Sequence, residues 1–179
     1  MRYFTLNSNH SEKWICFSEE KQQAHLIKLD MTSSKDASHQ TKIKIDWIEE
    51  GGEEEKWLDI HTCSPIFSVM SLKAENCLRK FLKPNGFLIS TIGLKNNYVI
   101  YNVTTVLENA LDWDSSKING DRNHLSQIHT AALYKNKIQD THIFKIGESR
   151  VDIFVSEEFK NEVEKYKLTG FVFKEIILR

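Results

Sequence analysis

The chain has 179 residues, which fits one large domain or two small ones packed together, and we expect a single domain. Hydrophobic residues make up 40% of it and charged residues 27%, which is typical of a globular protein with a substantial core. The 24 basic and 25 acidic residues leave a net charge of −1. A chain so balanced has no global field that would attract nucleic acid or an anionic membrane, and we expect neither as a partner.

The N-terminal residues and the cysteines indicate in which cellular compartment the protein is located. Residues 1–14 contain no apolar run long enough for a signal peptide or a membrane span, so we expect a cytoplasmic protein. The cysteines Cys16, Cys63 and Cys77 are odd in number and form no CxxC pair, which favours reduced thiols. Since only His61 and Cys63 offer a close pair of metal-binding side chains, we expect no metal site and no cofactor.

The first third of the chain has the character of strands. Residues 31–42 are polar and rich in turn formers, which predicts a mobile loop. Within Lys42–Ile48 every second residue is apolar, which is typical of a half-buried strand. The predicted strands of this region are Arg2–Leu6, Trp14–Phe17, His25–Leu29 and Lys42–Ile48, with a short extended piece at Leu58–Ile60.

In the middle of the chain, Ser68 or Ser71 can cap a helix that runs to about Leu82. Its apolar residues Ala74, Cys77, Leu78 and Phe81 follow helical spacing. Phe87–Ile92 and Tyr98–Val103 then predict a hairpin of two strands. For the remainder we expect a short helical turn or helix at Thr105–Leu111, a loop at Ser115–Asn123, and a short helix or irregular segment at Leu125–Tyr134.

The last third is the most clearly patterned. Two short strands, Ile143–Ile146 and Val151–Val155, lead to Ser156, a good helix cap. Phe159, Val163 and Tyr166 predict the buried stripe of that helix, and Phe171–Leu178 predicts a final strand. The order of elements predicts a single α+β domain, mainly antiparallel sheet with two or three short helices. We expect residues 1–56 to add strands and loops to a core formed by residues 57–179.

Motifs that carry catalysis are missing from the sequence. It contains neither phosphate-binding glycine loop, no nucleophile elbow, no HExxH zinc motif and no calcium loop. We therefore do not expect an enzyme. The alternative is an enzyme or small-ligand binder of unfamiliar type, whose pocket would draw on His61, His124, His129 and Asp121.

The segment Asp46–Asp59 is strongly acidic, with seven carboxylates against one lysine, a local charge of −6. One reading is a solvated acidic loop with two core tryptophans. The functional reading is a contact patch for a cationic partner, in which aromatic side chains supply the desolvated anchors. Its candidate partner-binding residues are Trp47, Glu49, Glu50, Glu53, Glu54, Glu55, Trp57 and Asp59.

The C-terminal sequence IFKIGESRVDIFVSEEFKNEVEKYKLTGFVFKEI, Ile143–Ile176, is similar to the closing segment of a family of bacterial polymorphic-toxin immunity proteins, immunity family eleven. The shared features are the strand, the strand ending in Ser156, the short helix, and a Leu-Thr-Gly-Phe turn into a last strand. Lys145 stands where the family would place an arginine. Pro65–Ser68, Tyr98–Val103 and Leu111–Asp112 extend the resemblance to about residues 57–176.

The resemblance implies a non-enzymatic protein that binds the C-terminal domain of a cognate toxin and blocks it. A heterodimer with that domain is the implied assembly, and a homo-oligomer stays open. The resemblance does not imply which toxin activity is blocked. A regulatory or scaffold protein without a toxin partner is a third reading.

Overall fold

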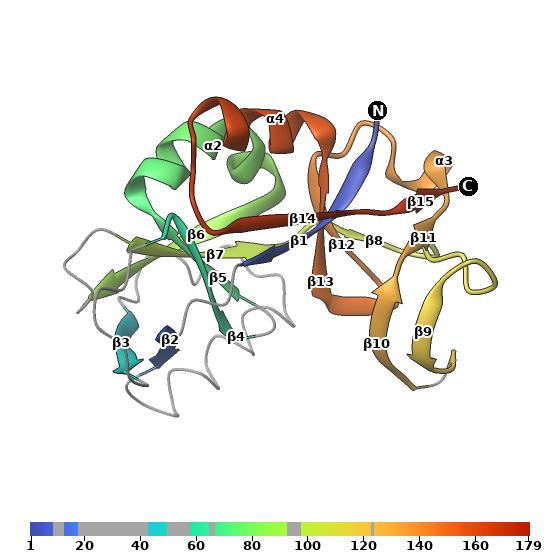
Figure 1. Cartoon of the computed structure of the whole chain (residues 1–179), viewed down its shortest axis with the longest axis horizontal. Coiled ribbons are helices and arrows are strands. Elements are labelled where there is room, and N and C mark those ends of the chain that lie inside the picture. The colour runs from blue at the N-terminus through green and yellow to red at the C-terminus, as the bar shows by residue number, and fades with distance from the viewer. Residues whose placement is uncertain (9–12, 18–42, 50–57, 65–66, 93–97, 123) are drawn as a thin grey trace.

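The computed structural model describes residues 1–8, 13–17, 43–49, 58–64, 67–92, 98–122 and 124–179 (Figure 1). The predicted strand His25–Leu29 and the predicted loop 31–42 lie outside these residues. The described parts form a single domain of mostly antiparallel sheet with three helices. The α+β prediction is therefore confirmed.

The larger sheet has six strands in the order β2-β3-β6-β7-β5-β4. β6 and β7 pair antiparallel, with Leu88 opposite Tyr101, which confirms the pairing predicted for this hairpin. β3 pairs parallel to β6, and the other neighbours pair antiparallel. β4 and β5 form an antiparallel pair that the sequence pattern did not reveal. The strands are β2 (Lys13–Phe17), β3 (Ile43–Glu49), β4 (Ile60–Ser64), β5 (Phe67–Ser71), β6 (Gly86–Ile92) and β7 (Tyr98–Val103).

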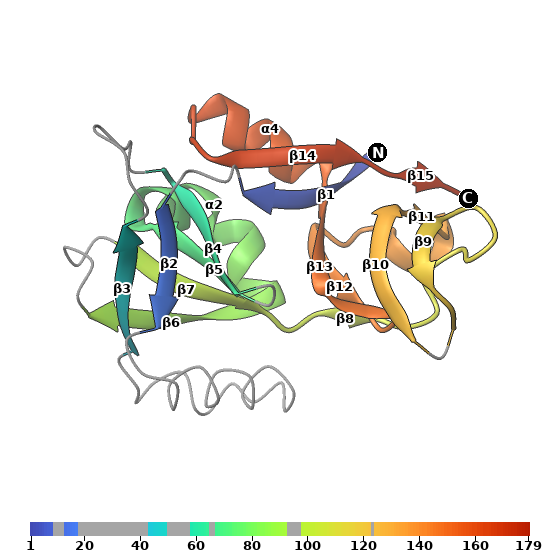
Figure 2. The ribbon, with the colours of Figure 1, turned by 60° about the horizontal axis from the view of Figure 1, so that its bottom comes forward.

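The second sheet joins the two ends of the chain. Its five strands follow the order β14-β1-β13-β12-β8, so β1 lies between two C-terminal strands (Figure 2). Phe4 stands opposite Val155 on one side and Glu175 on the other, both in antiparallel register. The strands are β1 (Tyr3–Ser8), β8 (Val106–Leu107), β12 (Ile143–Ile146), β13 (Ser149–Ser156) and β14 (Phe171–Glu175).

Two predictions for residues 105–134 were wrong, and a third left two alternatives open. The helical turn expected at 105–111 contains β8, because Val106 and Leu107 pair with β12. The loop expected at 115–123 contains a strand, β9, which pairs with β10 in the segment left between helix and irregular structure. Register shifts within that pair interrupt the period-two alternation that predicts strands. The elements are β9 (Lys117–Gly120), β10 (Leu125–Thr130), β11 (Ala132–Leu133), α3 (Lys135–Ile138) and β15 (Ile177–Leu178), which pairs with β11.

Helix α2 (Leu72–Asn85) begins where one of the two predicted caps places it. The Ser71 hydroxyl accepts a hydrogen bond from the Ala74 amide, 3.0 Å away, whereas Ser68 lies in β5. The helix runs past the predicted end and includes Pro84 in its last turn. Of the predicted stripe, Cys77 is only half-buried, while the other three residues, Ala74, Leu78 and Phe81, are buried.

Helix α4 (Glu157–Lys165) begins at the predicted cap, since the Ser156 hydroxyl accepts a hydrogen bond from the Phe159 amide. It ends in a Schellman motif: Lys167 has a φ of 50°, and the Leu168 amide donates to the Val163 carbonyl at 3.0 Å. Tyr166 was predicted to be buried and is 41% exposed. Because the helix ends at Lys165, the apolar contact expected of Tyr166 is made by Leu168, which is buried in the core.

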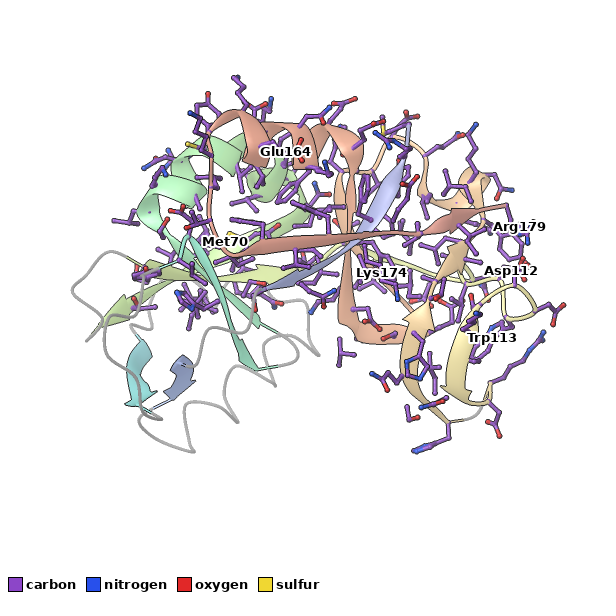
Figure 3. The ribbon with its side chains drawn as sticks, viewed as in Figure 1. Met70, Asp112, Trp113, Glu164, Lys174 and Arg179 are labelled. Carbon is purple, nitrogen blue, oxygen red and sulfur yellow. The ribbon has the colours of Figure 1, made fainter. Side chains whose placement is uncertain are left out.

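The main core lies where α2 and α4 pack against each other and against both sheets. Leu78 and Phe159 are fully buried there, and burying a side chain of this size contributes about 1.5–3 kcal/mol. A smaller core around Phe144 and Leu133 supports the two-stranded sheets. Figure 3 shows the C-terminal Arg179 beside Asp112 at this end of the molecule. The Arg179 Nε and the Asp112 Oδ2 are 3.8 Å apart.

Candidate functional site

The acidic stretch predicted as a contact patch is described only at its two ends. The backbone of Trp47 and Glu49 belongs to β3, where Trp47 stands opposite Ile15 and Glu49 opposite Lys13. At the other end, Asp59 immediately precedes β4. Residues 50–57, among them Glu50, Glu53, Glu54, Glu55 and Trp57, lie outside the described residues.

Asp59 is held inside the fold. Its carboxylate accepts hydrogen bonds from the Ser71 hydroxyl at 2.7 Å and from the Thr169 amide and hydroxyl at 2.9 and 3.1 Å. The Asp59 amide in turn donates to the Thr169 carbonyl at 3.0 Å, and its carbonyl accepts from the Ser71 amide. We call Asp59, Ser71 and Thr169 the Asp59 clamp. It joins the end of the acidic stretch to the start of α2 and to the turn before β14.

The electrostatics of the clamp favour the ionised aspartate. Burial of Asp59 opposes ionisation, but the hydrogen bonds from Ser71 and Thr169 and the charge of Lys73 prevail and lower its pKa. The Lys73 ammonium lies 3.5 Å from the carboxylate, and 58% of its side chain is exposed against 12% for Asp59. Because its carboxylate accepts these three hydrogen bonds, we assign Asp59 a role in the fold and do not include it in the contact surface.

His61 lies in β4, two positions after Asp59 of the clamp. Its ring is buried and contacts the Tyr98 ring edge-on at 5.9 Å, and its Nε2 accepts a hydrogen bond from the Leu58 amide. Burial lowers the pKa of His61 to about 4, against weaker opposing effects of Leu58 and Asp59. Burial and the charge of Asp59 raise the pKa of Tyr98 to about 12. Neither group therefore ionises near neutral pH.

The residues of the alternative pocket are not gathered in one place. His61 belongs to the larger sheet, while His129 belongs to β10 in the opposite part of the molecule (Figures 1 and 2). His129 lines a small polar hollow of about 280 Å³ together with Asp152 and Lys174. The lining of that hollow does not include Asp121 or His124, which hydrogen-bond to each other through the His124 amide and the Asp121 carboxylate.

Two other kinds of site can be checked over the described part of the chain. Within it, no group of three or more His, Cys, Asp or Glu side chains is placed to hold a metal ion. Nor is any helix of that part long and apolar enough to cross a membrane.

A surface that the sequence did not single out lies between α2 and α4. It is a groove of about 870 Å³, which we call the α2–α4 groove. Sequence reasoning overlooked it because Tyr166 was assigned to the core, and because nothing in the pattern shows that α2 and α4 are neighbours. Its lining residues are Asn76, Cys77, Arg79, Lys80, Lys83, Pro84, Glu162, Lys165 and Tyr166.

Comparison with known proteins agrees with the resemblance noted in the sequence. Residues 94–177 match the model of an immunity protein family, Imm11. These residues include β7, β9 to β11, α4 and most of the five-stranded sheet. The match assigns this part of the chain to the immunity protein family. No curated protein matches the chain.

Proposed function

We propose that the chain is an immunity protein that binds a cognate bacterial toxin and neutralises it by non-catalytic protein–protein interaction. The observation that carries the proposal is the match of residues 94–177 to the immunity protein family. The partner would be the C-terminal domain of the toxin, bound as a heterodimer in the cytoplasm. The scattered positions of His61, His124 and His129 agree with a protein that acts without catalysis.

For the contact surface we propose the acidic stretch, with Glu49, Glu50, Glu53, Glu54 and Glu55 as the charged contacts and Trp47 and Trp57 as the aromatic anchors. Toxins that act on nucleic acid need basic clefts, and carboxylates complement such clefts. Opposite charges raise the rate of association, while aromatic anchors slow dissociation. The Asp59 clamp supports the proposal because it fixes one end of this stretch to the part of the chain that matches the family.

The test is co-expression with the toxin domain encoded beside the gene. We expect the chain to restore growth of cells that make the active domain, and to co-purify with an inactivated form of it at 1:1 stoichiometry. Absence of a complex at micromolar concentration would overturn the proposal.

A matched variant addresses the enzyme alternative. His124 and His129 are both exposed, so we expect that changing both to alanine leaves the fold intact. Under our proposal this variant protects cells as well as the original chain does. Loss of protection with an intact fold would favour a catalytic role.

A further inference from the structure

The α2–α4 groove presents positive charge although its arginine and two of its lysines are paired with carboxylates. Arg79 pairs with Glu75, and the arginine side chain is 60% exposed while the glutamate side chain is 7% exposed. Glu162 is paired in the same way by two lysines, Lys80 from α2 and Lys165 from α4. The exposed fractions of these lysines are 61% and 63%, against 12% for the glutamate. A molecule that approaches the groove therefore meets the cations first.

Two further residues, one cationic and one aromatic, contribute to the surface of the groove. Lys83 is exposed on the last turn of α2, and among the described residues no ion pair involves it. Tyr166 is 41% exposed at the end of α4, and the Lys165 ammonium lies 4.7 Å from the centre of its ring. The groove thus combines a cationic rim with an aromatic side chain and the half-buried Cys77.

We propose that the α2–α4 groove docks an acidic amphipathic helix of the partner toxin, an inference that rests on the proposed function. Grooves between two helices accept the apolar face of a third helix, and this groove would pair the carboxylates of such a helix with its lysines. Its volume of about 870 Å³ suits several side chains of a docked segment. Nucleic acid fits less well, because the chain has a net charge of −1 and so lacks the broad positive field that attracts a phosphate backbone.

The proposal also gives the partner an orientation. The acidic stretch would meet a basic surface of the toxin and the α2–α4 groove an acidic one. Two contacts of opposite sign disfavour docking in the wrong orientation, because rotation would bring like charges together. An acidic helix outside the basic cleft of the toxin is therefore the feature to seek in the partner.

The test is the affinity of the Lys83→Glu, Tyr166→Ala variant for the inactivated toxin domain encoded beside the gene. A matched control is Lys137→Glu, Tyr134→Ala, which makes the same changes at exposed positions on and beside α3. We expect the groove variant to raise Kd by about tenfold to a hundredfold and the control by about twofold or less. Thermal unfolding of both variants shows that each is folded.

The outcomes separate the two proposals. If the original chain binds the toxin domain and the folded groove variant binds equally well, the groove proposal is wrong while the proposed function stands. If the original chain does not bind the domain, both are wrong. Binding of a 20-base-pair DNA or RNA duplex that the groove variant loses would show a nucleic-acid site and overturn the acidic helix.

Discussion

The carboxylate of Asp59 accepts two hydrogen bonds from Thr169, a residue 110 positions further along the chain. The backbone amide of Asp59 completes the exchange by donating to the Thr169 carbonyl. Such reciprocal bonding fixes both position and orientation, so the end of the acidic stretch and the turn before β14 behave as one unit.

Asp59→Asn keeps the size of the side chain but removes its charge and one acceptor. We expect the free energy of unfolding in urea to fall by about 1–3 kcal/mol, because the Thr169 amide and hydroxyl and the Ser71 hydroxyl lose a charged acceptor. Glu164→Gln is the control, since that carboxylate is 58% exposed and pairs with Lys160 on its own helix. Equal stability of the two variants would contradict a structural role for the clamp.

The free energy of unfolding should decrease in two separate pH windows as the pH is lowered. His61 has a pKa lowered to about 4, so below its ordinary value of 6.5 the unfolded chain binds a proton that the folded chain does not. Stability is therefore full above pH 6.5 and falls as the pH drops toward about 4, by up to about 3 kcal/mol. The lowered pKa of Asp59 acts below this window, because its contribution is lost only as the carboxylate becomes protonated.

Chemical denaturation between pH 7 and pH 4 measures the first window. His61→Gln should flatten it, whereas His124→Gln, at an exposed position, should leave it unchanged. If the pH profile of the His61 variant is the same as that of the original chain, folding does not lower the pKa of this histidine and the prediction is wrong.

Gly170 adjoins the clamp and has a φ of 87°, a conformation that L-residues adopt at a cost. A Cβ atom here would lie 2.8 Å from the Ile60 carbonyl oxygen and 2.9 Å from the Leu58 Cβ. We therefore expect Gly170→Ala to lower the free energy of unfolding by about 1–3 kcal/mol. At Gly147 the nearest atoms belong to the end of the Glu108 side chain, which can rotate away, so Gly147→Ala should be milder.

Replacing Glu53, Glu54 and Glu55 by lysine tests the acidic stretch as a contact surface. We expect the association rate with the toxin domain to fall by about tenfold or more at low salt and the difference to shrink at high salt. The variant Asp114→Lys, Glu158→Lys, Glu164→Lys changes the net charge equally at exposed positions elsewhere. If both variants associate at the same rate, net charge and not the acidic stretch controls the encounter.

Local chemistry made some parts of this fold predictable. Ser156 and the first turn of α4 could be assigned because a cap and its helix are neighbours in sequence, and the β6–β7 pairing because a short connection favours antiparallel partners. β9 and β10 were missed because register shifts disturb their alternation. The end of α4 could not be predicted, because it depends on a left-handed conformation of Lys167. Lysine rarely adopts this conformation, and no sequence pattern indicates it.

The candidate site was less predictable than the fold. The acidic stretch is visible in composition alone, and its contacts stay a prediction. The role of Asp59 depends on Thr169, and the α2–α4 groove depends on two helices that are far apart in sequence, since α2 ends at residue 85 and α4 begins at residue 157. Such pairings arise from tertiary packing, so neither charge patterning nor periodicity could reveal them.

The place of β1 between β13 and β14 has a consequence for synthesis. The ribosome releases residues 3–8 long before residues 149–175 exist, so this strand must wait without either neighbour. Strands β4 to β7 of the larger sheet and helix α2 have no such delay, because their residues are close in sequence. We therefore expect the nascent chain to assemble that sheet first and to close the molecule only when its last strands emerge. A partner that binds the finished protein would thus recognise only completed chains.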